Sequence, residues 1–310
     1  MYMRRIIISM LLLFLFIPLW SQVTEGEKIL REEAKDTLMG WKAGGLINLN
    51  TSQTSLTNWA AGGQSSLAFG SVVSLYANNK QEKSLWENTL NIAYGNIKQG
   101  KEDWRKTDDR FEFTSKLGLR ATNKLYYAGL LNFRTQLTNG YNYPDTENKI
   151  SGFLSPGYLL VAAGIDYKPY NNLSLYIAPA TWKLTIVTDQ ELADAGAFGV
   201  NPGENTKNEF GGYLRMFLNQ PLMENITFQT KLDLFSNYLK NPQNIDVSWE
   251  TLLSLKVNTF ISATLATHLM YDDDIDIWVD DNENGSVDSG EQHPRTQFKE
   301  VLAIGFSYTF

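Results

Sequence analysis

The sequence predicts an all-β protein, a transmembrane antiparallel up-and-down β-barrel of about twelve strands. Three observations favour this fold class. Apolar and polar residues alternate with a period of two in segments of about ten residues or more. Short and long connections alternate between those segments, and an apolar leader opens the chain. Together these features are typical of exported bacterial barrels rather than of soluble sandwiches.

The N-terminal segment, residues 1–21, has the features of a signal peptide. Arg4 and Arg5 supply its positive start, residues 6–19 form an apolar stretch, and Ser21 offers a small residue at the cleavage point. A single N-terminal membrane anchor is the alternative interpretation, but the stretch is short for a spanning helix. No later run reaches the ~18 apolar residues that such a helix requires.

The period-two pattern begins after a charged segment at 22–39, which we expect to form a periplasmic linker, and occupies 40–310. Its clearest example is the last segment, where one row of side chains is apolar or aromatic: Leu302, Ile304, Phe306, Tyr308 and Phe310. A soluble sandwich also alternates, but its strands average only about five or six residues. Segments of about ten residues can cross a bilayer at a tilt of about 45°. The terminal aromatic also resembles the assembly signal of outer-membrane barrels.

The connections test the barrel independently. The predicted strands are 41–50, 64–78, 84–97, 108–122, 125–138, 157–169, 173–187, 207–219, 225–238, 246–257, 260–271 and 296–310. Five connections are brief, namely 79–83, 123–124, 170–172, 220–224 and 258–259. The alternate ones are mostly longer and rich in Gly, Asn, Asp and Pro, namely 51–63, 98–107, 139–156, 188–206, 239–245 and 272–295. Short periplasmic turns and long outer loops follow this order in bacterial barrels, and an even strand number places both termini in the periplasm.

The composition limits the partners. The net charge of −7 and the pI of about 5.0 argue against nucleic acid, because no basic stripe is present to neutralise phosphates. Aromatic residues form 13% of the chain, as expected for interfacial girdles in contact with outer-membrane lipid. The chain has no cysteine, so neither a disulfide framework nor a thiolate metal site is available.

If the apolar rows face lipid, the partner rows line the interior with charged and polar side chains. The predicted lumen-lining residues are Arg110, Glu112, Lys116, Arg120, Lys231, Asp233, Glu250, Lys256 and His268. Two interpretations stay open. The charges could form cross-strand ion pairs that fill and stiffen the lumen, or they could line a polar path for a small solute. The sequence cannot decide, because loops can plug such an opening.

The last outer loop contains the sharpest motif, a twelve-residue stretch that matches the calcium loop of EF-hands. The predicted ligands are Asp280, Asn282, Asn284, Ser286 through its carbonyl, Asp288 and the bidentate Glu291, with Gly285 at the sharp turn. Ca²⁺ is thus the one cofactor predicted. With three carboxylates the expected affinity is weak, about 10⁻⁴–10⁻³ M. The alternative is an acidic, solvated hairpin tip. The nearby Asp272–Asp274 could join the site or end a strand in solvent.

Catalytic signals are weak. His268 should point inward, near Ser262 and Thr264, but a serine hydrolase needs the pair within about 3 Å and an orienting group. A polar residue lining the lumen is the simpler interpretation, so no catalytic residue is predicted. His293 lies beside the calcium loop, and Gly-rich residues 60–63 lack phosphate-binding spacing.

Several short motifs resemble a family of outer-membrane barrels of the Bacteroidota type that is known only as a domain of unknown function. They are Gly40-Trp41-Lys42, Gly44-Gly45, Ser52-Gln53, Leu56, Asn58-Trp59-Ala60-Ala61-Gly62-Gly63, Lys106-Thr107-Asp108-Asp109-Arg110, Phe133-Arg134-Thr135-Gln136, Gly140-Tyr141-Asn142-Tyr143-Pro144, Leu234-Phe235-Ser236-Asn237-Tyr238 and Tyr271-Asp272-Asp273-Asp274. The resemblance covers about 40–310. It implies an outer-membrane location and a barrel fold, and it implies no reaction and no catalytic residues.

The sequence therefore favours a non-enzymatic outer-membrane barrel, either a narrow channel for small solutes or a structural component of an envelope complex with a protein partner. Two alternatives belong to other classes. One is an outer-membrane lipid hydrolase, which should lose activity when His268 is replaced. The other is a calcium-dependent surface adhesin, which should lose binding in chelator.

Overall fold

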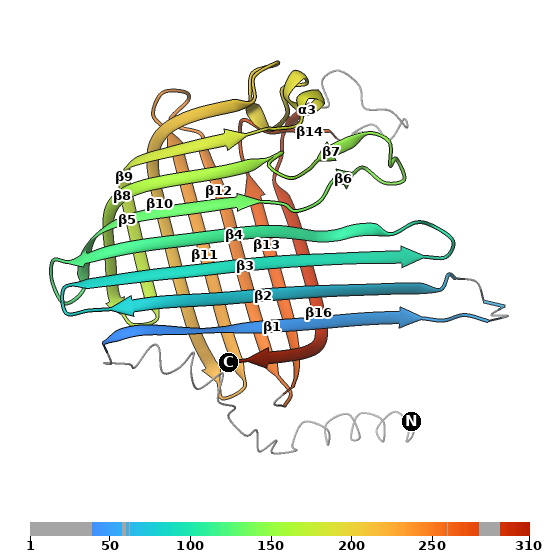
Figure 1. The fold of residues 1–310 in the computed structure, drawn as a ribbon, viewed down its shortest axis with the longest axis horizontal. Helices are drawn as coiled ribbons and strands as arrows, with labels where there is room; N and C mark the ends of the chain where they lie inside the picture. The colour runs from blue at the N-terminus through green and yellow to red at the C-terminus, as the bar shows by residue number, and fades with distance from the viewer. Residues whose placement is uncertain (1–38, 58–59, 62, 259, 279–291) are drawn as a thin grey trace, which may run out of the picture.

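The computed structural model describes residues 39–57, 60–61, 63–258, 260–278 and 292–310. Twelve antiparallel strands close into one barrel in the order β1-β16-β13-β12-β11-β10-β9-β8-β5-β4-β3-β2 (Figure 1). This confirms the predicted fold class and strand number. The predicted leader and nearly all of the predicted linker lie outside the described residues.

The barrel strands are long, from eleven to eighteen residues. Their bounds are β1 Gly40–Thr54, β2 Ser66–Lys80, β3 Ser84–Gln99, β4 Arg105–Arg120, β5 Leu125–Thr135, β8 Gly157–Tyr170, β9 Leu173–Ile186, β10 Thr206–Met223, β11 Ile226–Asn237, β12 Ile245–Lys256, β13 Ile261–Tyr271 and β16 Gln297–Thr309. Each overlaps one predicted strand. Every sheet neighbour except the closing pair is adjacent along the chain of barrel strands, so the topology is up-and-down.

The long connections contain small elements, most of which the sequence did not predict. β6 (Gly140–Tyr141) pairs with β7 (Lys149–Ser151), and β14 (Asp276–Trp278) pairs with β15 (Gln292–Pro294). A short helix, α3 (Gln190–Asp194), and the 3₁₀ turn η1 (Ala197–Gly199) lie between β9 and β10. Such short elements carry no period that a sequence pattern could detect. No helix of the described residues is long and apolar enough to cross a membrane.

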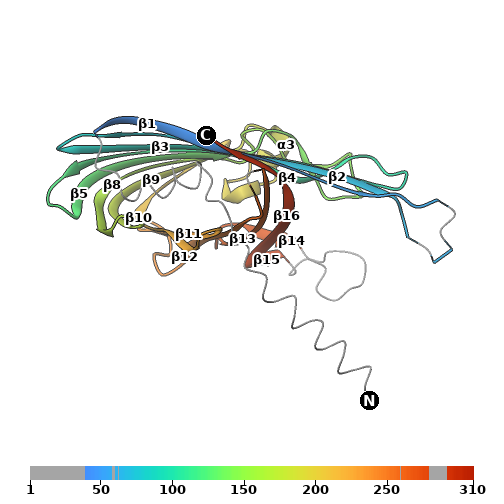
Figure 2. The ribbon, with the colours of Figure 1, turned by 90° about the horizontal axis from the view of Figure 1, so that it is seen from below.

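The barrel is flattened, so two walls face each other closely. Figure 1 shows β1–β4 running across the view, with β11–β13 behind them and crossing them at a steep angle. Figure 2 shows the two walls from below. The chain bends between the walls near β8–β10, where register shifts interrupt the ladders at Gly164 and directly after Gly211. A Cβ at these two positions would lie 2.1 Å from Ile177 O and 2.0 Å from Ser236 O. Glycine is therefore required where the ladders are bulged.

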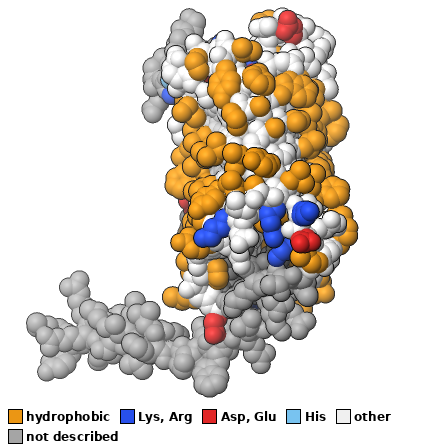
Figure 3. All heavy atoms as spheres, turned by 90° about the vertical axis from the view of Figure 1, so that its left-hand side faces the viewer, with side chains coloured by type: hydrophobic (Ala, Val, Ile, Leu, Met, Phe, Trp, Pro, Cys, Tyr) orange, Lys and Arg blue, Asp and Glu red, His pale blue; other side chains and the backbone are white. Residues whose placement is uncertain are grey.

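The outer surface is apolar. Large exposed side chains occur on nearly every strand, among them Trp41, Leu117, Tyr127, Ile177 and Leu302. Figure 3 shows hydrophobic side chains spread over the visible wall, with Lys and Arg gathered toward its lower part. Successive side chains in a strand point to opposite faces, so the row between these residues faces the interior. A protein with this exterior requires lipid or detergent around it.

Part of the interior is packed with apolar side chains. Ala128, Leu130, Ala162, Tyr176, Ala178, Tyr213 and Phe235 form one buried cluster that spans β5 to β11. The hydroxyl of Tyr176 donates to the carbonyl oxygens of Ala162, at 2.9 Å, and Ala128, at 3.2 Å. The small residues on β5 and β8 make room for the ring. This part of the lumen is filled by protein.

Candidate functional site: the barrel interior and outer mouth

A network of ion pairs crosses the centre of the barrel. Arg110 on β4 reaches Glu250 on β12 at 2.8 Å. Lys231 on β11 contacts Glu250 at 3.0 Å and Glu112 on β4 at 2.9 Å. Asn132 also donates to Glu112, at 3.0 Å. Because β4 is not a neighbour of β11 or β12 in the sheet, these contacts run through the interior and tie the two walls together.

A second network lies nearer the short turns. Lys116 on β4 contacts Asp166 on β8 at 2.7 Å and Glu87 on β3 at 3.1 Å. Lys168 binds Glu87 at 2.6 Å, and Ser174 donates to Asp166 at 2.6 Å. The lysines and carboxylates are equal in number, so the network neutralises itself.

Asp233 is held beside the apolar cluster. Arg215 grips its two oxygens with Nε and a terminal nitrogen at 2.6 and 2.9 Å, and the Tyr213 hydroxyl donates to it at 2.6 Å. This fork geometry is the strong form of an arginine–carboxylate pair. The pair therefore fixes the side chains of β10 and β11 against the buried rings.

The other predicted interior residues have separate environments. His268 Nε2 lies 2.9 Å from the Ser248 hydroxyl, a partner that the sequence did not suggest. Glu250 is opposite His268 in the β12–β13 register, but its carboxylate is engaged by Arg110 and Lys231. Arg120 is exposed at the end of β4, above the Tyr126 ring. Lys256 ends β12, and its backbone donates to Asn225.

The wall formed by β16, β1 and β2 differs from the charged part of the interior. Asn48 of β1 donates to Ser262 of β13 at 3.3 Å across the inner face of β16. Val72 lies opposite Asn48 and therefore shares its inward face, yet 37% of Val72 is exposed. Val301, opposite Ala266 on β13 and in the inward row of β16, is 36% exposed. Interior space adjoins this wall, because few side chains cover the two valines.

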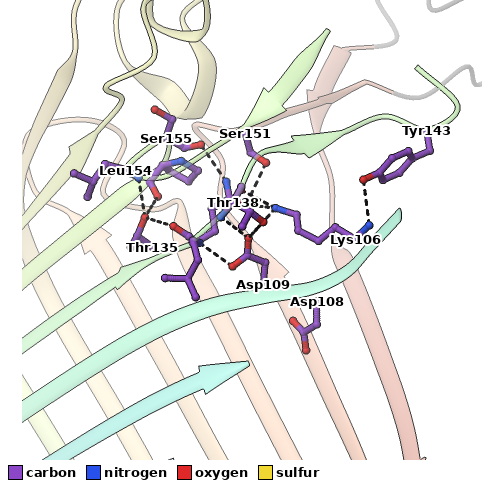
Figure 4. A network of polar contacts seen from close by, with 12 residues as sticks. Lys106, Asp108, Asp109, Thr135, Thr138, Tyr143, Ser151, Leu154 and Ser155 are labelled. Carbon is purple, nitrogen blue, oxygen red and sulfur yellow. Dashed lines mark hydrogen bonds and ion pairs between the residues drawn. The ribbon is translucent and has the colours of Figure 1, made fainter. Parts of the chain in front are cut away.

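At the outer mouth, Lys106 and Asp109 bind the connection that follows β5 (Figure 4). Asp109 accepts hydrogen bonds from the backbone amides of Leu137 and Thr138, at 2.7 and 2.8 Å, and from the Thr138 hydroxyl at 2.7 Å. Lys106 Nζ lies 3.0 Å from Asp109 and donates to Gln136 at 3.1 Å. The loop after β5 is therefore tied to the first residues of β4.

The same network continues into the next loop. Thr135 donates to the Pro156 carbonyl at 3.0 Å and accepts from the amide of Leu154 at 3.0 Å. Ser155 lies 3.2 Å from the Thr188 hydroxyl, and Lys149 pairs with Asp189. Several motifs behind the family resemblance, such as 106–110 and 133–136, thus build this network. Their conspicuous residues hold loops in place.

The loop between β9 and β10 has a small core of its own. Val187, Ala193 and Val200 are buried, with Leu192 and Phe198 packed against them. Asp189 caps α3 by accepting from the amide of Leu192 at 3.3 Å. Gly199, at φ +78°, lies against Asp274, because a Cβ there would be 2.8 Å from the Asp274 carbonyl oxygen. The loop therefore packs as an ordered lobe against the segment after β13.

An acidic cluster surrounds the mouth beside this lobe. Asp274 pairs with Lys207 at 2.6 Å and Lys240 at 2.8 Å, while Lys183 contacts Asp246 at 2.6 Å and Asp272 at 3.4 Å. Burial opposes ionisation of Asp274, but hydrogen bonds from the two lysines outweigh it and lower the pKa of the carboxyl group. The pairs hold three strands and two loops together, so Asp272–Asp274 is more than a solvated strand end.

The predicted calcium ligands, from Asp280 to Glu291, lie outside the described residues. The described chain flanking them is the short β14–β15 hairpin, with Asp276 opposite Pro294. Within the described ranges, no group of three or more His, Asp or Glu side chains is arranged to hold a metal ion.

The family and fold comparisons can be set beside this geometry. Residues 51–141, from the end of β1 to β6, match a family described as "Protein of unknown function (DUF3078)". That range contains the Lys106–Asp109 network. No curated protein matches the chain.

Solved structures that resemble the chain include three barrels. The translocator domain of autotransporter NalP from Neisseria meningitidis has 10% identity and a TM-score of 0.37, over 91% of this chain and 93% of that one. The NanC porin has 8% identity and a TM-score of 0.38, over 84% and 98%. The COG4313 outer membrane channel from Pseudomonas putida F1 has 9% identity and a TM-score of 0.40, over 89% and 97%. At these values the likenesses assign no activity.

Replacing Lys231 with Met should destabilise the barrel, because among the described residues Lys231 is the one ion-pair partner of Glu112 and one of two for Glu250. Removing one partner of a buried ion pair lowers the free energy of unfolding by about 3–5 kcal/mol. Urea unfolding in lipid vesicles, followed by the electrophoretic shift of the folded barrel, measures the change. Lys101→Met in an exposed loop is the control, and adding Glu112→Gln should recover part of the loss. An unchanged midpoint for Lys231→Met would contradict the bracing role.

Replacing Asp109 with Asn should release the loop after β5, because three donors would lose a charged acceptor. Hydrogen bonds to charged groups contribute about 1.5–3 kcal/mol each. Hydrogen–deuterium exchange should then speed up across 136–156. Asp145→Asn is the control, since Asp145 bonds only within its own loop, to Glu147 and Asn148. Equal exchange rates in the two variants would show that Asp109 does not hold the loop after β5 in place.

Proposed function

We propose that the protein is a non-enzymatic β-barrel of the bacterial outer membrane that acts as a narrow channel for small solutes. One observation carries this proposal: the two sides of the interior differ in how well they are filled. Charged and aromatic side chains fill the interior between β4 and β12, while the inward valines of β2 and β16 remain more than one-third exposed. A path along the β16–β1–β2 wall would be lined by the uncharged Asn48, Val72 and Ser262, with Lys299 of β16 paired to Asp108 at its end.

The ion pairs support a fixed, narrow opening. Charges that are already neutralised within the protein offer no strong binding site to a passing ion, so selectivity would depend on size and on hydrogen bonding. The tied outer loops further restrict access. The alternative role, a structural component that binds another envelope protein, is the outcome expected if the barrel does not conduct.

The location and origin of the protein belong to the same proposal. A closed barrel with an apolar exterior fits the outer membrane, where a signal peptide at 1–21 would direct it. The partial family match at 51–141 supports an uncharacterised family, and the motifs beyond it extend the proposal to a Bacteroidota-type barrel spanning 40–310.

Purified protein in planar bilayers should give small, uniform conductance steps. Val72→Trp should reduce the step size, because the indole would occupy the free space beside the wall. Val73→Trp is the matched control: Val73 lies opposite Ile47 and Ile92 on the outward face, so its steps should equal those of the wild type. An absence of steps in bilayers of synthetic lipid and in bilayers of native lipid extract alike would refute the channel and leave the structural role.

The Ser248–His268 contact does not make the protein a hydrolase in this proposal. Both side chains lie on the inward face, away from lipid, and the nearest carboxylate is engaged by two cations. A serine-directed fluorophosphonate should therefore leave Ser248 unlabelled.

Calcium binding by 280–291 stays a prediction from the sequence, and an adhesin would depend on it. Titration calorimetry should show one weak Ca²⁺ site in the detergent-solubilised protein, with an affinity of about 10⁻⁴–10⁻³ M. The variant Asp280→Asn/Glu291→Gln should abolish the heat, because it removes the first and the bidentate ligands. Asp103→Asn, in an exposed loop away from the motif, is the control for loss of a surface carboxylate. Equal heats in all three proteins would refute the motif.

A further inference from the structure

The closing junction of the barrel is unusually short. β1 pairs with β16 over five residue pairs, from Leu46 opposite Thr309 to Asn50 opposite Gly305. By contrast, β1 pairs with β2 over fifteen positions and β13 with β16 over ten. Beyond Asn50, β1 continues to Thr54 beside β2 alone.

The outer half of β16 therefore has a free edge among the described residues. β16 remains paired with β13 from Gln297 to Phe306. Its other edge pairs with no described strand from Gln297 to Ile304. In Figure 1, β1 runs across the lower edge of the barrel while β16 turns upward, away from it. The two strands enclose a gap, which we call the β1–β16 seam.

The outward face of β16 beside the seam is mostly apolar. Phe298, Leu302 and Ile304 are 63%, 70% and 64% exposed, and the exposed Glu300 lies between Phe298 and Leu302, so the part from Leu302 to Ile304 is suited to lipid contact. Unpaired backbone groups in hydrocarbon cost several kcal/mol each, and a barrel normally avoids them. An opening at this place therefore needs a polar group that forms hydrogen bonds with the free strand edge, or a function that accounts for the cost.

Contacts on either side of the seam keep it open. Lys299 of β16 pairs with Asp108 of β4, which lies three strands beyond β1 in the sheet, so the outer half of β16 is held beneath the β1–β4 wall and does not follow the edge of β1. At the closed end, a Cβ on Gly305 would lie 2.2 Å from Leu49 O, so the strands touch there as closely as backbone allows. The inner side of the seam carries the exposed Val301, beside the wall of Val72.

From this geometry we propose that the β1–β16 seam is a lateral portal, through which a single-chain amphiphile such as a fatty acid passes between the bilayer and the interior. The inference deepens the proposed channel and rests on it. The apolar side chains on both faces of β16 would receive the acyl chain. The free backbone groups of β16 and the polar Ser52 and Thr54 of β1 would bind the head group.

The open seam can be tested with paired cysteines, since the chain has none of its own. Gly45 and Phe310 exchange both backbone hydrogen bonds at 3.0 Å, so Asn48 and Ser307 form a non-hydrogen-bonded pair, the closer type. Asn48→Cys/Ser307→Cys should therefore cross-link on oxidation. Ser52→Cys/Ala303→Cys, the next-but-one such pair if the register continued, should not, because a disulfide cannot join Cα atoms more than about 7 Å apart. Cross-linking of the second pair would overturn the portal.

Passage can be tested with a bimane fluorophore on single cysteines in vesicles that contain nitroxide-labelled stearic acid. Val301→Cys, inside the seam, should lose fluorescence nearly as fully as the lipid-facing Leu302→Cys. Asn91→Cys on β3, which faces the interior two strands away from β1, is the matched control and should lose less. If Val301 is quenched no more than Asn91, the portal is refuted.

Conductance of the same labelled proteins separates the two proposals. Steps without quenching at Val301 would refute the portal and leave the channel standing. Quenching without steps would refute the channel, and with it the through-path that the portal serves.

Discussion

The constraint on which this structure depends is the need to pair backbone hydrogen-bonding groups where no water is available. It explains why the strands are long, why neighbours along the chain pair with one another, and why the sheet returns to its own first strand. It also gives meaning to the place where the pairing is short. In a soluble sandwich a free strand edge is ordinary, but beside lipid it is a feature to be explained.

Inside the closed sheet, ion pairs join the two walls of the barrel. The flattened walls bring β4 opposite β11 and β12, so charges that would otherwise line an open lumen meet as Arg110–Glu250 and Lys231–Glu112. The wall of β1, β2 and β16 carries no such charges at Asn48, Val72 or Val301, and this contrast gives the interior a filled side and an open side. The proposed path follows the open side because the filled side leaves no room for it.

The period of two was enough to predict the barrel, because strand length and loop alternation both follow from the membrane. It also placed Arg110 and Glu250 in inward rows, but not their pairing, since partners on β4 and β12 are distant in sequence and depend on how strongly the barrel is flattened. Ser248 beside His268 was missed for the same reason. The α3 lobe was missed because Val187, Ala193 and Val200 show no period, and the short β1–β16 junction because register at closure leaves no local signal.

The outer loops described above are joined to one another as well as to the strands. Ser155 meets Thr188, Lys149 meets Asp189, and Gly199 fits against Asp274, so three separate connections share their contacts. Surface loops usually diverge independently among related proteins. Here a change in one loop would have to be matched in the next, so the end of the barrel that carries the long loops should evolve as one coupled unit, with compensating pairs of substitutions at these contacts.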